Sequence, residues 1–303
     1  MSNHFGHVAT VCLLACAAAV SAAPPSTSPS SVATVEAETR AMVEAVQASR
    51  KIGPAQVALR DQAKLNLASG YIWVPTPAAA QLMRSMGNSA SDNLVGIVLP
   101  ADGRSWIAVV KFSKEGYIKD DDAKDWNADE LLDGLRKGTE TQNQERAKRG
   151  FAQMELVGWA QKPLYDAGSH QLVWSVISKD KGASGSEDRD INYNTYALGR
   201  EGFINLNLVT TERDLAKYKP EALKLLGALH FIDGKRYADF NASTDKVAAY
   251  GLAALVAGAA AKKLGLLAVV LAFLAKFAKV AVVAGGAALW GVAKMFKKQS
   301  PSA

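Results

Sequence analysis

Hydrophobic and polar residues alternate in short runs over most of the chain, and this pattern predicts β-strands. Between residues 53 and 112 the runs include "AQVAL", "YIWVP", "VGIVL" and "SWIAVVKF", separated by Gly, Pro, Asn and Asp. The pattern returns after residue 153 in "MELVGWA", "QLVWSVIS", "NYNTYALG" and "FINLNLVT". Short strands bounded by turn residues are typical of antiparallel sheets.

Helical spacing of apolar residues separates these strand regions. It occurs after residue 35, around residues 78–86, over residues 127–149 and over residues 212–229. The third segment has Asn127 or Asp125 as a capping residue and basic residues at its end. Because strands joined by short turns alternate with separate blocks of helix, we expect an α+β fold: a mostly antiparallel sheet with flanking helices.

The pattern changes after residue 243, where apolar runs cover residues 247–261, 264–275 and 280–293. None reaches the roughly 20 residues that span a bilayer, but residues 264–293 together predict a C-terminal apolar helical membrane anchor. Its fourteen Leu, Val and Phe residues favour insertion by about 6 kcal/mol, whereas Lys276 and Lys279 oppose it by about 5 to 7 kcal/mol. The two contributions nearly cancel.

The small and charged residues of this tail share one helical face. Lys276 and Lys279 lie on the side of the terminal lysines, close to a stripe formed by Gly251, Gly258, Gly265 and Gly286. One interpretation is an inserted helix whose Gly/Lys face packs on other membrane helices or on a second copy, so that an oligomer encloses a polar path. The other is a helix that lies on the membrane surface with its lysines in water.

Charge is distributed unevenly along the 303 residues, whose formal net charge is +6. No acidic residue follows Asp245, but eight lysines do; without them, 27 basic residues face 29 acidic ones. The positive charge therefore belongs to the apolar tail, which favours a lipid bilayer with anionic headgroups as the partner. The rest of the chain has no nucleic-acid motif, so no nucleic-acid partner is expected.

The first residues predict secretion. "VATVCLLACAAAVSAAP" is apolar, uncharged and ends in small residues, as in a signal peptide over residues 1–22. Cleavage after Ala22 removes both cysteines, which excludes disulfides and thiol chemistry; the alternative is a lipidated Cys16. A linker over 23–34 and a periplasmic domain over 35–243 follow. The terminal lysines favour a cytoplasmic C-terminus, and hence an inner-membrane protein with its bulk in the periplasm.

Candidate chemistry is sparse. "PLYDAGSH" brings Tyr165, Asp166 and His170 together, and an Asp–His pair can act in general acid–base catalysis, although a loop histidine bonded to Asp166 is the structural alternative. Asp120 and Asp122 are the weak metal candidates, without EF-hand spacing. No hydrolase, zinc-protease or P-loop motif is present. We therefore expect no metal and no cofactor, and enzymatic activity is not favoured.

A ligand groove is predicted in "NYNTY". Asn192, Tyr193 and Asn194 alternate as in a strand with one solvated face, and that face can line a groove.

Several stretches resemble a known family. "GYIKDDDA", "TQNQERAKRGFAQMELVGWAQKPLYDAGSHQLVW" and "NYNTYALGREGFINLNLV" are similar to a bacterial family of uncharacterised membrane-anchored proteins, a domain of unknown function. The resemblance runs from about Ile52 to the C-terminus. It implies a Gram-negative envelope protein with a signal peptide, a periplasmic domain and a C-terminal anchor, and it supplies no established activity or catalytic residue.

These observations predict a membrane-anchored periplasmic protein with a binding or assembly role in the envelope. One alternative is a membrane-tethered hydrolase or transferase that uses His170 with Asp166 and an Asp from residues 120–125. Another is an oligomer whose polar Lys/Gly helix face lies in the membrane.

Overall fold

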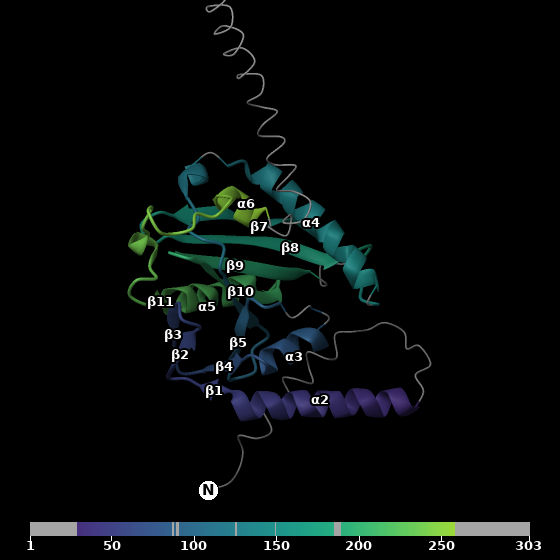
Figure 1. The fold of residues 1–303 in the computed structure, drawn as a ribbon. Helices are drawn as coiled ribbons and strands as arrows, with labels where there is room; N and C mark the ends of the chain where they lie inside the picture. The colour runs from purple at the N-terminus through teal and green to yellow at the C-terminus, as the bar shows by residue number, and fades with distance from the viewer. Residues whose placement is uncertain are drawn as a thin grey trace, which may run out of the picture. The chain divides into compact units, whose positions relative to one another are not determined.

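An antiparallel sheet of eight strands forms the centre of the computed structural model (Figure 1). The described residues are 29–86, 88, 91–124, 126–148, 150–184 and 189–257, with side chains from residue 37 onward. The strand order is β1-β4-β5-β6-β10-β9-β8-β7. The strands are β1 (Lys51–Ile52), β4 (Tyr71–Pro75), β5 (Leu94–Pro100), β6 (Ile107–Ser113), β7 (Met154–Asp166), β8 (Gln171–Asp180), β9 (Asp190–Gly199) and β10 (Gly202–Thr211).

The large sheet consists of two meanders. Strands β4, β5 and β6 pair in sequence order, and so do β7, β8, β9 and β10. The meanders meet where β10 pairs with β6, with Phe203 opposite Ser113. A smaller sheet has the order β11-β3-β2 and comprises β2 (Ala55–Leu59), β3 (Ala63–Leu67) and β11 (Leu229–Phe231).

Helices cover both faces of the large sheet. They are α2 (Pro29–Ser49), α3 (Ala78–Ser85), α4 (Ala128–Lys148), α5 (Leu215–Gly227) and α6 (Leu252–Val256), with short 3₁₀ turns at Asp121–Lys124 and Tyr237–Asp239. Helix α5 packs on β9 and β10 from one face, where Ile204, Leu206 and Leu208 are buried. On the opposite face α4 packs on β7, whereas α2 and α3 pack on β4 and β5 (Figure 1).

Local sequence signals explain several of these elements. Asn127 caps α4, because its Oδ1 accepts hydrogen bonds from the backbone N–H groups of Asp129 and Glu130. Strand β10 buries every second residue on the α5 face, as strand geometry requires. The predicted α+β fold with a large antiparallel sheet and flanking helices is confirmed.

The membrane-anchor part of the fold prediction is corrected. Within the described residues, which end at Ala257, no helix is long and apolar enough to cross a membrane. Part of the first apolar run belongs to the domain core instead, since Leu252, Leu255 and Val256 of α6 are buried against Ile118 and Leu131. The predicted span over residues 264–293 lies outside the described residues.

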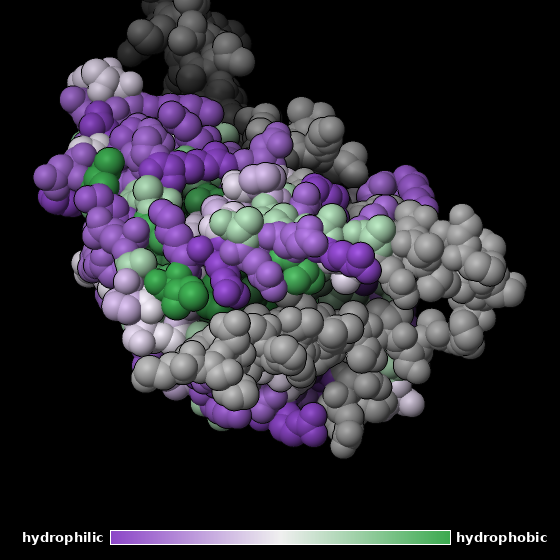
Figure 2. Space-filling view, turned by 90° about the horizontal axis from the view of Figure 1, so that it is seen from below, coloured by the Kyte–Doolittle hydropathy of each residue, from purple (hydrophilic) through white to green (hydrophobic). Residues whose placement is uncertain are grey.

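The surface of the described residues is mixed in character. Where the face seen from below is coloured in Figure 2, hydrophobic residues form small groups among hydrophilic ones. The large hydrophobic side chains that are exposed are Ile52, Leu164, Leu223 and Val247, which come from separate segments.

Candidate functional site

Five polar residues form a strip across the middle of the large sheet, on the face away from α5. Directly paired residues of an antiparallel sheet project to the same face, with Cβ atoms about 4.5 to 5.5 Å apart. Asn207 on β10 pairs with Asn194 on β9, and Asn205 pairs with Lys111 on β6. Asn192 shares the face of Asn194 because it lies two residues away on β9. We refer to Lys111, Asn192, Asn194, Asn205 and Asn207 as the polar strip.

The polar strip separates two apolar clusters on the same face. Asn207 and Asn194 belong to a row of paired residues that runs across the strands. In this row the residue paired with Asn194 on β8 is Trp174, which packs under α4. On the other side the next residue is Val109 on β6, which packs with α3. The row is thus apolar at both ends and polar in the middle. Asn194 is buried, and the other four residues of the strip are half-buried.

Hydrogen bonds hold the asparagine amides in place. Asn207 Nδ2 donates to Asn192 Oδ1 over 3.0 Å, and Asn205 Nδ2 donates to the Thr195 carbonyl over 3.3 Å. Asn194 Nδ2 donates to the Asn192 carbonyl over 3.3 Å. Asn207 Oδ1 is buried without a partner among the described residues, although a buried acceptor without a hydrogen bond costs about 1 to 3 kcal/mol. The amides are therefore ordered, and one acceptor is unused.

Lys111 is the charged member of the strip. Burial lowers the pKa of its ammonium group, and no carboxylate among the described residues contributes to that shift. It also has no ion-pair partner there, whereas Lys114, Lys224 and Lys235 each bind a glutamate. A cation in the middle of a sheet has thus been partly removed from water without compensation by an acid.

The predicted groove residues are divided between the two faces. Asn192 and Asn194 belong to the polar strip. Tyr193 projects to the α5 face, where it is fully buried and its hydroxyl donates to Gln161 Oε1 over 3.0 Å.

Two of the three candidate catalytic residues, Tyr165 and His170, form a chain of hydrogen bonds with Asp120 at the turn between β7 and β8. Tyr165 donates its hydroxyl proton to Asp120 Oδ2 over 2.7 Å, and its oxygen lies 3.2 Å from His170 Nδ1. Burial, with the hydrogen bond to Asp120 as a second cause, raises the pKa of Tyr165. The ring of His170 stacks on Tyr237, 4.1 Å between centroids, and Tyr237 stacks on Tyr117. The hydroxyl and imidazole are thus packed among aromatic rings.

Asp166 is not part of this chain. Its Oδ1 accepts from the Gly168 backbone N–H over 2.9 Å and its Oδ2 from Ser169 Oγ over 2.7 Å, so its carboxylate closes the turn. The hydrogen bond from Ser169 is the main cause that lowers the pKa of Asp166. The carboxylate nearest to His170 is Asp120, with 3.9 Å between His170 Nδ1 and Asp120 Oδ2.

The metal candidates have structural partners. Asp122 accepts hydrogen bonds from the backbone N–H groups of Leu252 and Ala253, over 2.9 and 3.1 Å, and so caps α6. Asp120 is bonded to Tyr165. Within the described ranges no three His, Cys, Asp or Glu residues are grouped as metal ligands are.

Of the predicted helix-packing residues, only Gly251 can be placed. It precedes α6, and a Cβ added to it would lie 2.4 Å from Asp122 Oδ2, so a side chain there would disturb the cap. Gly258, Gly265, Lys276, Lys279 and Gly286 lie outside the described residues.

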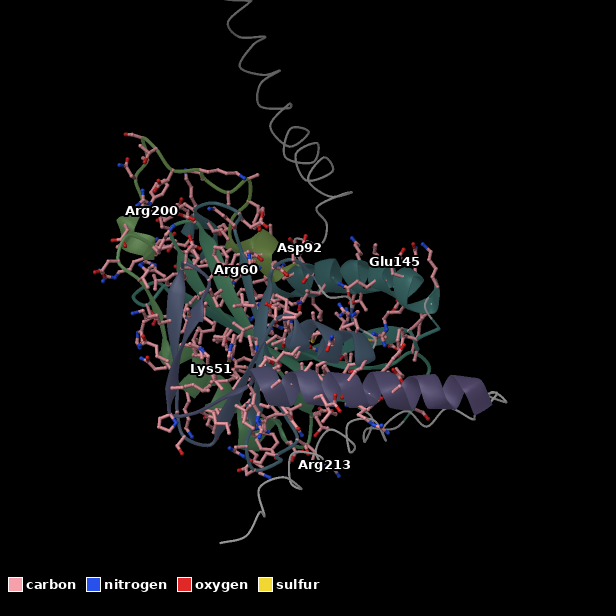
Figure 3. The ribbon with its side chains drawn as sticks, turned by 60° about the horizontal axis from the view of Figure 1, so that its bottom comes forward. Lys51, Arg60, Asp92, Glu145, Arg200 and Arg213 are labelled. Carbon is pink, nitrogen blue, oxygen red and sulfur yellow. The ribbon has the colours of Figure 1, made fainter. Side chains whose placement is uncertain are left out.

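A separate pocket of about 450 Å³ lies beside the smaller sheet. Arg60 and Asp92, labelled near each other in Figure 3, line it with Trp73 and Thr76. Arg60 adopts a positive φ of 56° and donates from Nη2 to the Asp92 carbonyl. One N–H of the guanidinium is therefore engaged, and Arg60 itself is exposed.

Asn205, Asn207 and Lys111 are the site residues that the sequence analysis missed. The two asparagines had a readable signal, because "FINLNLV" places them at alternate positions between apolar residues. Lys111 had a weaker one, as the charged residue of "VVKFS". Its position opposite Asn205 depends on the pairing of β6 with β10, which no local pattern specifies.

Comparison with known proteins identifies a family. Residues 51–286 match the family described as Protein of unknown function (DUF2167), so the chain belongs to it. No curated protein matches the chain. The Gram-negative envelope character of the resembled family stays a prediction.

Two solved structures are similar over part of the chain. One is the solution structure of cyanobacterial PsbP (CyanoP) from Synechocystis sp., with 17% identity, a TM-score of 0.37, and coverage of 60% of this chain and 91% of that one. The other is the crystal structure of PA94 from Pseudomonas aeruginosa, a protein of unknown function, with 11% identity, a TM-score of 0.21, and coverage of 57% and 92%. Both likenesses are too remote to identify a ligand.

Proposed function

We propose that this member of the DUF2167 family is a binding domain that takes a polar ligand along the polar strip of its large sheet. The observation that carries the proposal is the unused polarity in the middle of an otherwise apolar face. Among the described residues, Asn207 Oδ1 is buried without a hydrogen-bond partner and the Lys111 ammonium has no carboxylate partner. Buried polar groups are normally satisfied, so groups left open indicate a partner that supplies the missing contacts.

The contrast between the two faces of the same strands supports this function. On the α5 face β10 contributes Ile204, Leu206 and Leu208, all fully buried. On the other face the two middle positions are Asn205 and Asn207, between Phe203 and Val209. If that face served only to bury surface, apolar residues in place of the asparagines would contribute more to the free energy of unfolding. Burial of each Leu or Ile side chain contributes about 1.5 to 3 kcal/mol.

The alternative of a hydrolase or transferase has weaker support. The carboxylate of Asp166 accepts hydrogen bonds within its own turn. Tyr165 and His170 are packed between Asp120 and a stack of aromatic rings. An acid–base pair needs access to a substrate proton, and this arrangement better suits a contact that holds two segments of the domain together.

We also propose that the domain acts outside the cytoplasm. The apolar, uncharged residues 8–22 and the absence of cysteine after Cys16 support this location.

A ligand screen with matched variants tests the binding function. Asn207→Leu removes the unpaired acceptor together with the hydrogen bond to Asn192 Oδ1, so its melting temperature without ligand is measured first and ligand effects are taken relative to it. Asn66→Leu changes an exposed asparagine on β3 and serves as the control. Melting temperatures of the full-length chain are measured with neutral and acidic monosaccharides, amino acids and short peptides. We expect a ligand that binds the wild type and the control, and binds Asn207→Leu about tenfold more weakly, as the loss of one hydrogen bond predicts.

Two results would contradict the proposal. One is a panel in which no compound stabilises the wild type. The other is a ligand whose affinity is the same in all three proteins.

A further inference from the structure

Lys111 differs in its surroundings from the ion-paired lysines of the domain. Lys181 lies 3.0 Å from Glu140 Oε2 and Lys114 lies 3.0 Å from Glu201 Oε2, both in exposed positions where water already solvates the charge. Lys111 lies in a central strand, where water solvates it less, and has no such partner in the described part of the chain. An ammonium group in this position gains more from an anion than an exposed one does, because Coulomb attraction strengthens as solvation falls.

Unused N–H donors lie around the same position. A side-chain amide carries two N–H donors, and the hydrogen bonds above use one each in Asn194, Asn205 and Asn207. Asn205 is directly opposite Lys111, and Asn207 is two residues further along β10. One ammonium and several amide N–H groups on one surface form a set of donors that complements a carboxylate or phosphate.

From this set of donors we infer that the ligand of the polar strip carries an oxyanion, a carboxylate or a phosphate, and that Lys111 binds it with the amide of Asn205. The inference rests on the proposed function and specifies the chemistry of the ligand. A neutral ligand would satisfy the amides and leave the ammonium uncompensated. A cationic ligand would add repulsion at the centre of the strip. An oxyanion accepts from both the ammonium and the amide N–H groups, and Asn207 Oδ1 is left for a donor, such as a hydroxyl, elsewhere on the ligand.

Simple anions probe this site in the full-length chain. Melting temperatures are compared in sodium chloride, sodium acetate and sodium phosphate of equal ionic strength at pH 7, for wild type, Lys111→Met and Lys64→Met. Lys64 is exposed on β3 and is the matched control. Lys111→Met replaces an uncompensated charge by an apolar chain of similar length, so we expect it to fold at least as stably as the wild type. Phosphate stabilises most proteins by exclusion from their surface, and that effect is common to all three chains.

We expect acetate or phosphate to raise the melting temperature of the wild type and Lys64→Met by several degrees more than that of Lys111→Met. A larger effect of acetate identifies a carboxylate, and a larger effect of phosphate identifies a phosphate. Equal responses in all three proteins would overturn the inference.

The two proposals fail separately. If neutral ligands depend on Asn207 but anions do not depend on Lys111, the binding function stands and the oxyanion is wrong. If anions depend on Lys111 but no ligand depends on Asn207, the oxyanion site stands and the proposal of a ligand that extends along the strip to Asn207 is wrong.

Discussion

Glu221 on α5 is a carboxylate that the fold has nearly removed from water, with 8% of the residue exposed. Tyr71 donates its hydroxyl to Oε2, and Arg104 Nη1 lies 3.1 Å from Oε1. Burial alone raises the pKa of Glu221, but the hydrogen bonds from Tyr71 and Arg104 outweigh burial and leave the pKa below its ordinary value. This buried acid is fully compensated, unlike Lys111, and it therefore contributes to stability rather than to binding.

We predict that Glu221→Ala lowers the free energy of unfolding at pH 7 by about 3 kcal/mol, because it leaves Arg104 and Tyr71 unpaired near the core. The folded-state pKa of Glu221 is depressed, so its stabilisation is present above the unfolded-state pKa and is lost as pH falls through the folded-state value. Urea unfolding at pH 7 and pH 3 should therefore show a smaller acid-induced loss in the variant. Lys224→Ala is the control: it removes an exposed partner and should cost less than about 1 kcal/mol. Equal losses in both variants would contradict this account.

At the scale of elements, α6 depends on one side chain from a distant segment. Asp122 caps its first turn, and the helix has only five residues, too few to be stable alone. The cap therefore decides whether Leu252 and Leu255 stay packed in the core.

We predict that Asp122→Ala costs about 1 kcal/mol of stability or more and speeds hydrogen exchange at the Leu252 and Ala253 amides, which lose their acceptor. Asp121→Ala changes the exposed neighbour and should leave both measurements unchanged. Unaltered exchange in Asp122→Ala would show that packing alone holds α6.

The sequence predicts the helices and strands better than it predicts which of them pack or pair with one another. Alternation identified the strands, and the two candidate caps, Asn127 and Asp125, located the start of α4 to within a few residues, because both signals are local. The order of the strands followed no local signal, since β6 and β10 are far apart in the chain. For the same reason the apolar residues of α6 were assigned to a membrane tail: composition does not distinguish a segment that enters a bilayer from one that completes a core.

The candidate site was predictable to the extent that it lies within single strands. Asn192 and Asn194 follow from the alternation in β9, and Asn205 and Asn207 have the same pattern in β10. The contacts of His170 were partly predictable: Tyr165 is near in sequence and an aspartate from residues 120–125 was anticipated, whereas the stacking on Tyr237 depends on a segment far along the chain.

At the scale of the whole molecule, the proposed location makes a claim about the N-terminus of the mature protein. We predict cleavage after Ala22, with Val20 and Ala22 as the small residues that the peptidase requires. The intact mass of the exported chain should therefore equal that of a chain whose first residue is Ala23. Ala22→Tyr should leave the precursor uncleaved, and Cys16→Ser should have no effect. A mature chain that begins at an acylated Cys16 would instead establish the lipidated alternative.

The meeting of the two meanders at β6 and β10 has a consequence for folding. Each meander is built from local pairings, which close quickly, whereas the pairing of Ser113 with Phe203 closes a long loop and should form late. Lys111 and Asn205 lie on opposite sides of this seam. A ligand that contacts both therefore binds only the chain in which the two halves have already joined, and it slows their separation.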